Sequence, residues 1–181
     1  MDTRAKLIQA AIDVLQIDQG ATTEKIAEVA GVTRRTLHRY FSSKDDLLVA
    51  VSGQMVNTCI ANVKNAMNAS ELPEEQLKLM FHSDIDCGYQ YAFIHDVSKD
   101  MPSYGKQTQE DFNEMMNTFK TVILNVKESA KVSPHVTVGW MEYAYYGLLE
   151  GATRALRDGA VAPRDIKKMA WRSYWNGIKK E

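Results

Sequence analysis

Hydrophobic residues recur at spacings of three and four along almost the entire chain, and sustained alternation of hydrophobic and polar residues does not occur. The first such stripe runs from Leu7 to Leu15, with polar and charged residues at the positions between. This spacing places apolar side chains on one face of a helix, whereas alternation would place them on one face of a strand. We therefore predict an all-α fold, with a first helix that Gly20 closes.

Four prolines divide the later part of this helical pattern. Pro73, Pro134 and Pro163 each precede an amphipathic stretch, and a proline in the first turn of a helix sacrifices no hydrogen bond. We predict helix starts at these three prolines, with Ser133 as the cap ahead of Pro134. Pro102 is typical of a turn.

Two short helices are predicted to meet at a glycine near the N-terminus. The first is capped by Thr22 or Thr23 and ends at Gly31, where a positive φ suits a tight turn between helices. Thr33 caps the second, residues 34–41, whose apolar members face the core. A glycine-containing turn between two short helices is typical of a helix-turn-helix.

The charged side chains of this second helix are all basic, although the chain as a whole, with 22 Lys and Arg against 23 Asp and Glu, has a formal net charge of -1. Lysine and arginine bind DNA phosphates, and an arginine such as Arg34 or Arg35 pairs well with a guanine edge. Ser43 and Asp46 predict a capping box for the next helix, with Lys44 at its N-terminus to hold a phosphate. The alternative is a solvated face, which most charge runs form.

Residues 22–48, "TTEKIAEVAGVTRRTLHRYFSSKDDLL", resemble the DNA-binding signature of the tetracycline-repressor (TetR) family of bacterial transcription regulators. The resemblance implies an N-terminal three-helix DNA-binding domain, a larger ligand-sensing domain, and a homodimer that reads a near-palindromic operator in double-stranded DNA. Side-chain chemistry and the resemblance together predict these DNA-contact residues: Thr23, Thr33, Arg34, Arg35, Thr36, His38, Arg39, Tyr40 and Lys44.

Two positions depart from the family pattern. Where relatives often have a tyrosine followed by a histidine, this chain has His38 and Tyr40, so an expected phosphate contact from a tyrosine hydroxyl falls on an imidazole. Arg35 stands where a small residue is common, which adds a basic contact that many relatives lack.

We predict a DNA-binding domain at 1–46 and an effector-binding and dimerisation domain at 47–181. A long helix from Lys44 to about Ala69 is predicted to link them, because its apolar stripe needs partners at both ends. The predicted function is a ligand-responsive repressor that a small molecule of unknown identity releases from its operator.

The predicted effector pocket lies in a segment rich in aromatic residues and methionine, residues 80–119. Small-molecule sites are mostly apolar with a few polar anchors. The alternative is that such a stripe is plain core. His82 and Asp86, four residues apart with Cys87 adjacent, also have metal-ligand spacing, although we predict no metal and no cofactor. The predicted pocket residues are Phe81, Tyr89, Phe93, Phe112, Met115, Met116, Phe119 and Tyr143.

The last two predicted helices are apolar on more than one face, which indicates a second buried contact besides the core. A dimer made from two helices of each chain satisfies this pattern, and the alternative is a buried helix pair within one subunit. The predicted dimer residues are Ala144, Gly147, Leu148, Gly151, Ala155, Met169, Trp171, Tyr174, Trp175 and Ile178.

Several classes of protein fit the sequence poorly. The chain has no nucleophile motif, phosphate-binding glycine loop or HExxH, so we predict that it is not an enzyme. Cys59 and Cys87 lack CxxC spacing and predict neither a disulfide framework nor a thiolate metal site. The longest uncharged run is too polar for a membrane span, and we expect a cytoplasmic protein without membrane contact. Two alternatives remain: an enzyme using residues 82–96, or a DNA-binding regulator whose second domain is a ligand-free dimerisation scaffold.

Overall fold

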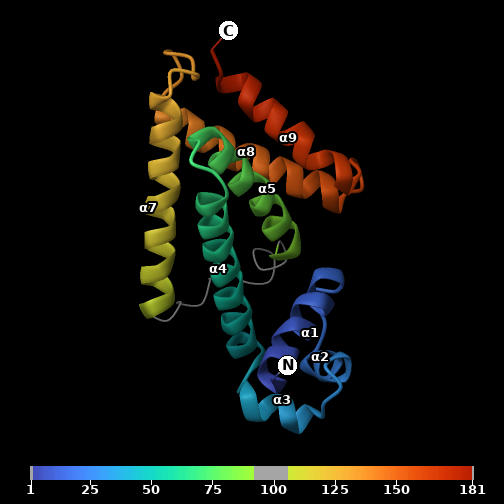
Figure 1. Ribbon diagram of the computed structural model, residues 1–181. Helices are drawn as coiled ribbons and strands as arrows, with labels where there is room; N and C mark the ends of the chain where they lie inside the picture. The colour runs from blue at the N-terminus through green and yellow to red at the C-terminus, as the bar shows by residue number, and fades with distance from the viewer. Residues whose placement is uncertain (1, 92–105, 181) are drawn as a thin grey trace. The chain divides into compact units, whose positions relative to one another are not determined.

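The computed structural model describes residues 2–91 and 106–180, and in these the predicted all-α fold is confirmed (Figure 1). Apart from an isolated bridge between Val132 and Lys179, the described residues form no β-structure. None of the described helices has both the length and the apolar character needed to cross a membrane. The helices are α1 (Thr3–Ile17), α2 (Thr23–Val29), α3 (Arg34–Tyr40), α4 (Lys44–Ala69), α5 (Pro73–Tyr91), α7 (Lys106–Glu128), α8 (Val138–Arg157) and α9 (Pro163–Ile178).

The chain divides into two compact units, and the division falls within α4. Among the described residues, the first unit contains 2–57, 90–91 and 106–109, and the second contains 58–89 and 110–180.

In the first unit, α1, α2, α3 and the start of α4 enclose an aliphatic core. Side chains with no exposed surface come from each of these helices: Leu7, Leu15, Ile26, Leu37 and Leu47. Helix α1 ends at Ile17, three residues before the predicted stop at Gly20. The Gly20 amide instead donates to the Asp18 carboxylate (3.0 Å), so this glycine belongs to the turn that leads into α2.

The second unit is built around aromatic rings from four helices. Tyr145 of α8 lies edge-on to Phe81 of α5 and Phe119 of α7, with ring centroids 4.9 and 4.8 Å apart. The ring centroid of Tyr174 of α9 lies 5.8 Å from that of Tyr145. Edge-to-face packing at these distances is favourable beyond the area buried. The four rings are at most 5% exposed, so they are the centre of this core.

The predicted helix starts at Pro73 and Pro163 are confirmed, whereas the one at Pro134 is wrong. Helix α8 begins at Val138, because the Thr137 hydroxyl caps it by accepting the Trp140 amide (3.2 Å). The Ser133 amide donates to the carbonyl of Ile178 (2.9 Å), so the segment before α8 is tied to the end of α9. Pro102 lies outside the described residues.

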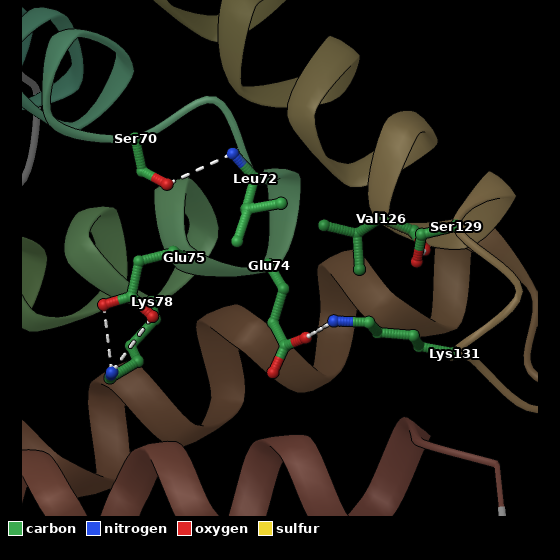
Figure 2. Close-up of polar contacts among 8 residues, drawn as sticks. All are labelled: Ser70, Leu72, Glu74, Glu75, Lys78, Val126, Ser129 and Lys131. Atoms are coloured by element: carbon green, nitrogen blue, oxygen red, sulfur yellow. Dashed lines mark hydrogen bonds and ion pairs between the residues drawn. The ribbon is translucent and has the colours of Figure 1, made fainter.

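Polar contacts hold the connections of the second unit in place (Figure 2). The Leu72 amide donates to the Ser70 hydroxyl (3.1 Å) in the turn between α4 and α5. Lys131, after α7, forms an ion pair with Glu74 in the first turn of α5 (2.7 Å). Exposed pairs of this kind contribute little energy, so they orient segments that the aromatic core stabilises.

Candidate DNA-binding surface

The connection between α2 and α3 is a tight, well-capped turn. The Thr22 hydroxyl accepts the Lys25 amide (3.4 Å) and the Thr33 hydroxyl accepts the Thr36 amide (3.1 Å), which confirms the predicted caps. Gly31 has φ of 70°, a conformation that strains any residue with a Cβ. Amides at this turn bond back into α2, so the angle between the two helices is fixed by local backbone chemistry.

Helix α3 has one buried side and one basic side. Leu37 is fully buried and Tyr40 is half-buried, whereas Arg34, Arg35, His38 and Arg39 are exposed. The N-terminal end of the helix is slim, because the side chains of Thr33 and Thr36 are small. Their hydroxyl groups are hydrogen-bonded to each other (3.0 Å). A short helix with small side chains between arginines fits the width of a major groove.

The two neighbouring arginines of α3 differ in their contacts. Arg34 Nε lies 2.8 Å from the Glu24 carboxylate and 3.4 Å from His38 Nε2. Backbone and Thr22 hydrogen bonds, and then the Arg34 charge, lower the pKa of Glu24 and keep this partner ionised. Arg35 has no hydrogen bond or ion pair within the described part of the chain. Arg35 is therefore the more available of the two for a DNA base.

The other predicted DNA-contact residues surround this helix. Thr23 is half-buried with its hydroxyl 3.4 Å from Glu24, and the Arg39 guanidinium carbon lies 5.2 Å from the centre of the Tyr40 ring. Stacking on Tyr40 holds the guanidinium at the surface without using its N–H groups.

Lys44 has a structural role that the sequence did not reveal. Its ammonium donates to the carbonyls of Ala21 (2.9 Å) and Gln19 (3.3 Å), which leaves one of its three N–H groups for a phosphate. The predicted capping box next to it is only half correct. Ser43 caps the Asp46 amide (3.1 Å), but the Asp46 carboxylate returns to the Ser42 amide (2.9 Å) instead of the Ser43 amide.

The structure does not gather the predicted effector-pocket residues around one space. Phe81 and Phe119 are core residues, whereas Phe112, Met115 and Met116 are half-buried on α7 and Tyr89 is 41% exposed. Phe93 lies outside the described residues.

The structure places Tyr143 on the surface of α8 and not in the core. Two helical positions correspond to about 200° of rotation, so Tyr145 points into the core while Tyr143 points away from it. Tyr143 is 79% exposed and borders an apolar groove between α8 and α9.

A buried polar pair in the second unit was not among the predicted site residues. The Tyr145 hydroxyl donates to the Asp84 carboxylate at 2.6 Å, across 61 residues of sequence. Burial raises the pKa of Asp84 to about 6, and the hydrogen bond from Tyr145 acts in the opposite direction. Two residues before Asp84 on α5, His82 Nε2 is buried with no hydrogen-bond partner in the described part of the structure. Burial, more than the nearby lysines, lowers the pKa of His82.

The alternative of a metal site at His82 and Asp86 finds no geometric support. Asp86 is exposed and forms an ion pair with Lys167 of α9 (2.5 Å). Within residues 2–91 and 106–180, no three His, Cys, Asp or Glu side chains are grouped as metal ligands.

Helices α8 and α9 pack side by side (Figure 1), and five of the predicted dimer residues line a groove between them: Ala144, Gly147, Leu148, Tyr174 and Ile178. The groove there, about 430 Å³ in volume, is bordered by Trp140, Tyr143, Ala144, Gly147 and Leu148 of α8, together with residues of α9. Gly147, Gly151 and Met169 are exposed, whereas Ala144, Leu148, Ala155, Trp171 and Trp175 are half-buried.

Two of the predicted dimer residues are buried within the subunit. Tyr174 and Ile178 are each 1% exposed, and the Tyr174 hydroxyl donates to the Met141 carbonyl (3.2 Å). These side chains have almost no surface left to bury in a dimer, so they support the groove from beneath.

Comparison with known proteins agrees with this geometry. The sequence profile described as "Bacterial regulatory proteins, tetR family" matches residues 18–51. The repressor LfrR of Mycolicibacterium smegmatis is 25% identical over 162 residues, which cover 87% of this chain and 80% of LfrR. The regulator BetI of Rhizobium meliloti is 34% identical over 80 residues, 42% of this chain and 39% of BetI.

Solved structures extend the likeness to the whole fold. The crystal structure of LfrR from Mycobacterium smegmatis in complex with proflavine has a TM-score of 0.76 at 23% identity, over 99% of this chain and 97% of that one. The ketosteroid regulator KstR2 of Mycobacterium tuberculosis has a TM-score of 0.77 at 16% identity, over 99% and 96%. The profile match covers the same capped turn and basic helix that the geometry singles out. Residues 18–51 therefore match the DNA-binding part of the tetR family of bacterial regulatory proteins, and this chain is a DNA-binding transcriptional regulator.

Proposed function

We propose that this protein is a repressor that binds a near-palindromic operator as a homodimer and leaves it when a small molecule binds. The observation that carries the proposal is the exposed basic side of α3, with Arg34 and Arg35 on the second helix of a pair hinged at Gly31. Such a helix is suited to the major groove, and a dimer would present two copies one DNA turn apart, about 34–36 Å.

Each DNA-contact residue has a role in this proposal. Arg35 reads a guanine edge, because it has no competing partner in the described part of the chain. Arg34 also contacts DNA, once its guanidinium has left the ion pair with Glu24. Arg39 and the remaining N–H of Lys44 bind phosphates, which fix the register without reading sequence. The hydroxyl groups and His38 complete the surface, as follows: Thr23, Thr33, Thr36, His38 and Tyr40.

The proposal divides the work between a DNA-binding domain at 1–46 and an effector-binding and dimerisation domain at 47–181. For dimerisation, support comes from the apolar groove between α8 and α9, where Trp140 is 59% exposed and Tyr143 is 79% exposed. Large exposed apolar residues grouped on one face are typical of an interaction surface.

For the effector, support comes from the family and from LfrR, whose crystal structure contains proflavine. In this chain, we propose a site beside the half-buried residues Phe112, Met115 and Met116 of α7. Tyr146 of α8 reaches this group, because its hydroxyl lies 3.8 Å from Met116 Sδ. We assign no catalytic role to any residue, and binding to chromosomal DNA means that the proposal includes a cytoplasmic location.

Selection of bound duplexes from a random DNA pool tests the DNA-binding part of the proposal. We expect enrichment of a palindrome, and relaxed preference at one position of each half-site for Arg35→Ala. Arg164→Ala is the matched control, because Arg164 is an exposed arginine at the start of α9, far along the chain from α3. Unselective recovery of duplexes by a folded, dimeric protein would contradict the proposal.

The effector part is tested by titrating small molecules, beginning with proflavine, into the protein–operator complex. A compound that raises the melting temperature of the free protein should also lower operator affinity, by about five- to 150-fold for ordinary coupling. Compounds that bind the protein and leave operator affinity unchanged would favour the ligand-free scaffold instead.

A further inference from the structure

The two cysteines of the chain lie in contact, although 28 residues separate them in sequence. Cys59 of α4 and Cys87 of α5 are both free thiols, and their sulfur atoms are 2.9 Å apart. A disulfide bond is about 2.05 Å long, so the sulfurs need to approach by less than 1 Å to become bonded.

The two thiols differ in exposure and acidity. Cys59 is partly exposed, whereas Cys87 is buried. The hydrogen bond from Cys87 lowers the pKa of Cys59, against the opposing effects of burial and the Asp84 carboxylate. The same contact, and then burial, raises the pKa of Cys87. Because the thiolate is the reactive form, Cys59 is the thiol that an oxidant reaches and Cys87 is placed to resolve the product.

The helix that carries Cys87 has little freedom to move away. At the next residue, Gly88, an added Cβ would lie 2.8 Å from the Thr153 hydroxyl of α8, so α5 and α8 approach closely there. One turn earlier, Ile85 is fully buried and Asp84 is bonded to Tyr145. The backbone of α5 therefore holds Cys87 toward Cys59.

We propose that Cys59 and Cys87 are an oxidisable dithiol that a hydroperoxide converts into a disulfide within one subunit. The Cys59 thiolate attacks a peroxide oxygen, the O–O bond breaks, and Cys59 becomes a sulfenic acid while the leaving oxygen departs as water or an alcohol. The Cys87 sulfur then attacks the Cys59 sulfur and expels the sulfenic oxygen as water. Both thiols lose their hydrogen atoms, the S–S bond forms, and the hydroperoxide takes up the two electrons.

The bond would join α4 to α5 and close a long loop in the second unit. Cross-links across loops of this size stabilise the folded state, mainly by restricting the unfolded chain. Helix α4 is also the helix that begins at Lys44, immediately after the DNA-reading segment. The inference is independent of the proposed function, because the dithiol would be oxidised whether or not the protein bound an operator.

The test uses the full-length reduced protein treated with hydrogen peroxide. The expected product has lost the mass of two hydrogen atoms and migrates as a monomer on a non-reducing gel. Digestion of this product should yield a peptide pair linked by Cys59 and Cys87. Its melting temperature should rise by about 5–10 °C and return on reduction. Unfolding the protein in denaturant before oxidation should slow formation of the intramolecular bond by about tenfold or more, because the native contact is lost.

Two single variants separate the roles of the thiols. Cys87→Ser should stop at oxygen adducts on Cys59, and Cys59→Ser should react far more slowly because Cys87 is buried. The proposal is overturned if wild-type protein gains oxygen atoms, or forms disulfide-linked dimers, without forming the Cys59–Cys87 bond. It is equally overturned if Cys59→Ser is oxidised as fast as wild type.

Discussion

The two units of this protein handle polar groups in opposite ways. In the first unit, charged side chains lie on the surface and the polar backbone is satisfied by nearby caps such as Thr33. In the second unit, a carboxylate, Asp84, is held among aromatic rings by one tyrosine hydroxyl. A surface side chain can be exchanged with little effect on folding, whereas a buried one changes stability and function together. We therefore expect function to be separable from stability in the first unit and coupled to it in the second.

The largest expected effect is in the aromatic core. Phe81→Ala removes a ring that contacts Tyr145, Trp171 and Tyr174, and should lower the free energy of unfolding by about 3–5 kcal/mol. Urea unfolding followed by circular dichroism measures this loss. Ile17→Ala is the control, because Ile17 is 89% exposed and its removal should change stability by no more than about 0.5 kcal/mol. An equal loss of unfolding free energy in the two variants would contradict the assignment of Phe81 to the core and Ile17 to the surface.

The next effect concerns the buried carboxylate and pH. The folded pKa of Asp84, about 6, is above its ordinary value of 3.8, so its stabilising contribution is complete below pH 3.8 and is lost as pH rises through 6. At pH 8 the ionised group costs about 3 kcal/mol. Asp84→Asn should therefore be more stable than wild type at pH 8 by up to that amount, with little gain near pH 4.

The matched control for this prediction is Asp86→Asn, because Asp86 is an exposed carboxylate two positions away on the same helix. Thermal unfolding of both variants across pH 4–8 makes the comparison. A gain for Asp84→Asn that does not change with pH would mean that the carboxylate is not desolvated as the structure indicates.

A smaller effect is expected at the N-terminal cap of α3. Thr33→Ala leaves the Thr36 amide without its acceptor and should cost about 1 kcal/mol. Thr121→Ala on α7 is a useful contrast, since that hydroxyl only bonds back to the Asn117 carbonyl within a helix. Alanine there should be neutral or slightly stabilising. Denaturant unfolding distinguishes the two, and a loss at Thr121 as large as at Thr33 would contradict the assignment of the cap.

The smallest expected effect is on operator affinity, and it comes from a change at Glu24 that should leave stability unaltered. Glu24→Gln releases Arg34 from its ion pair and removes a negative charge beside the DNA-binding surface. Operator affinity should rise by about two- to fivefold, with an unchanged melting temperature, because an exposed ion pair adds little to folding. Fluorescence anisotropy with a labelled operator measures the affinity. A weaker complex would show that Glu24 positions Arg34 for DNA and does not compete with DNA.

Sequence reasoning succeeded where the deciding interactions are local. The caps at Thr22 and Thr33, the positive φ of Gly31, and the starts at Pro73 and Pro163 each depend on residues within one turn. These features define the helix-turn-helix, so the local geometry of the candidate DNA-binding surface was largely predictable.

Sequence reasoning failed where contacts between residues distant in sequence decide the local structure. Pro134 does not begin α8, because Ser133 is bonded to the end of α9. The Asp84–Tyr145 pair and the contact between Cys59 and Cys87 join helices, and no spacing in the sequence encodes them. Periodicity showed that α8 and α9 have more than one apolar face, but it did not show that Tyr174 belongs to the inner one.

The central claim is that the basic side of α3 reads a particular DNA sequence. Its most direct test is the ratio of affinities for the selected palindrome and for a scrambled duplex of the same composition, measured at about 0.15 M salt, where phosphate contacts alone bind weakly. The account predicts a ratio of about 1,000 or more for wild type, reduced by about tenfold or more in Arg35→Ala. Equal affinity of wild type for the two duplexes would contradict it.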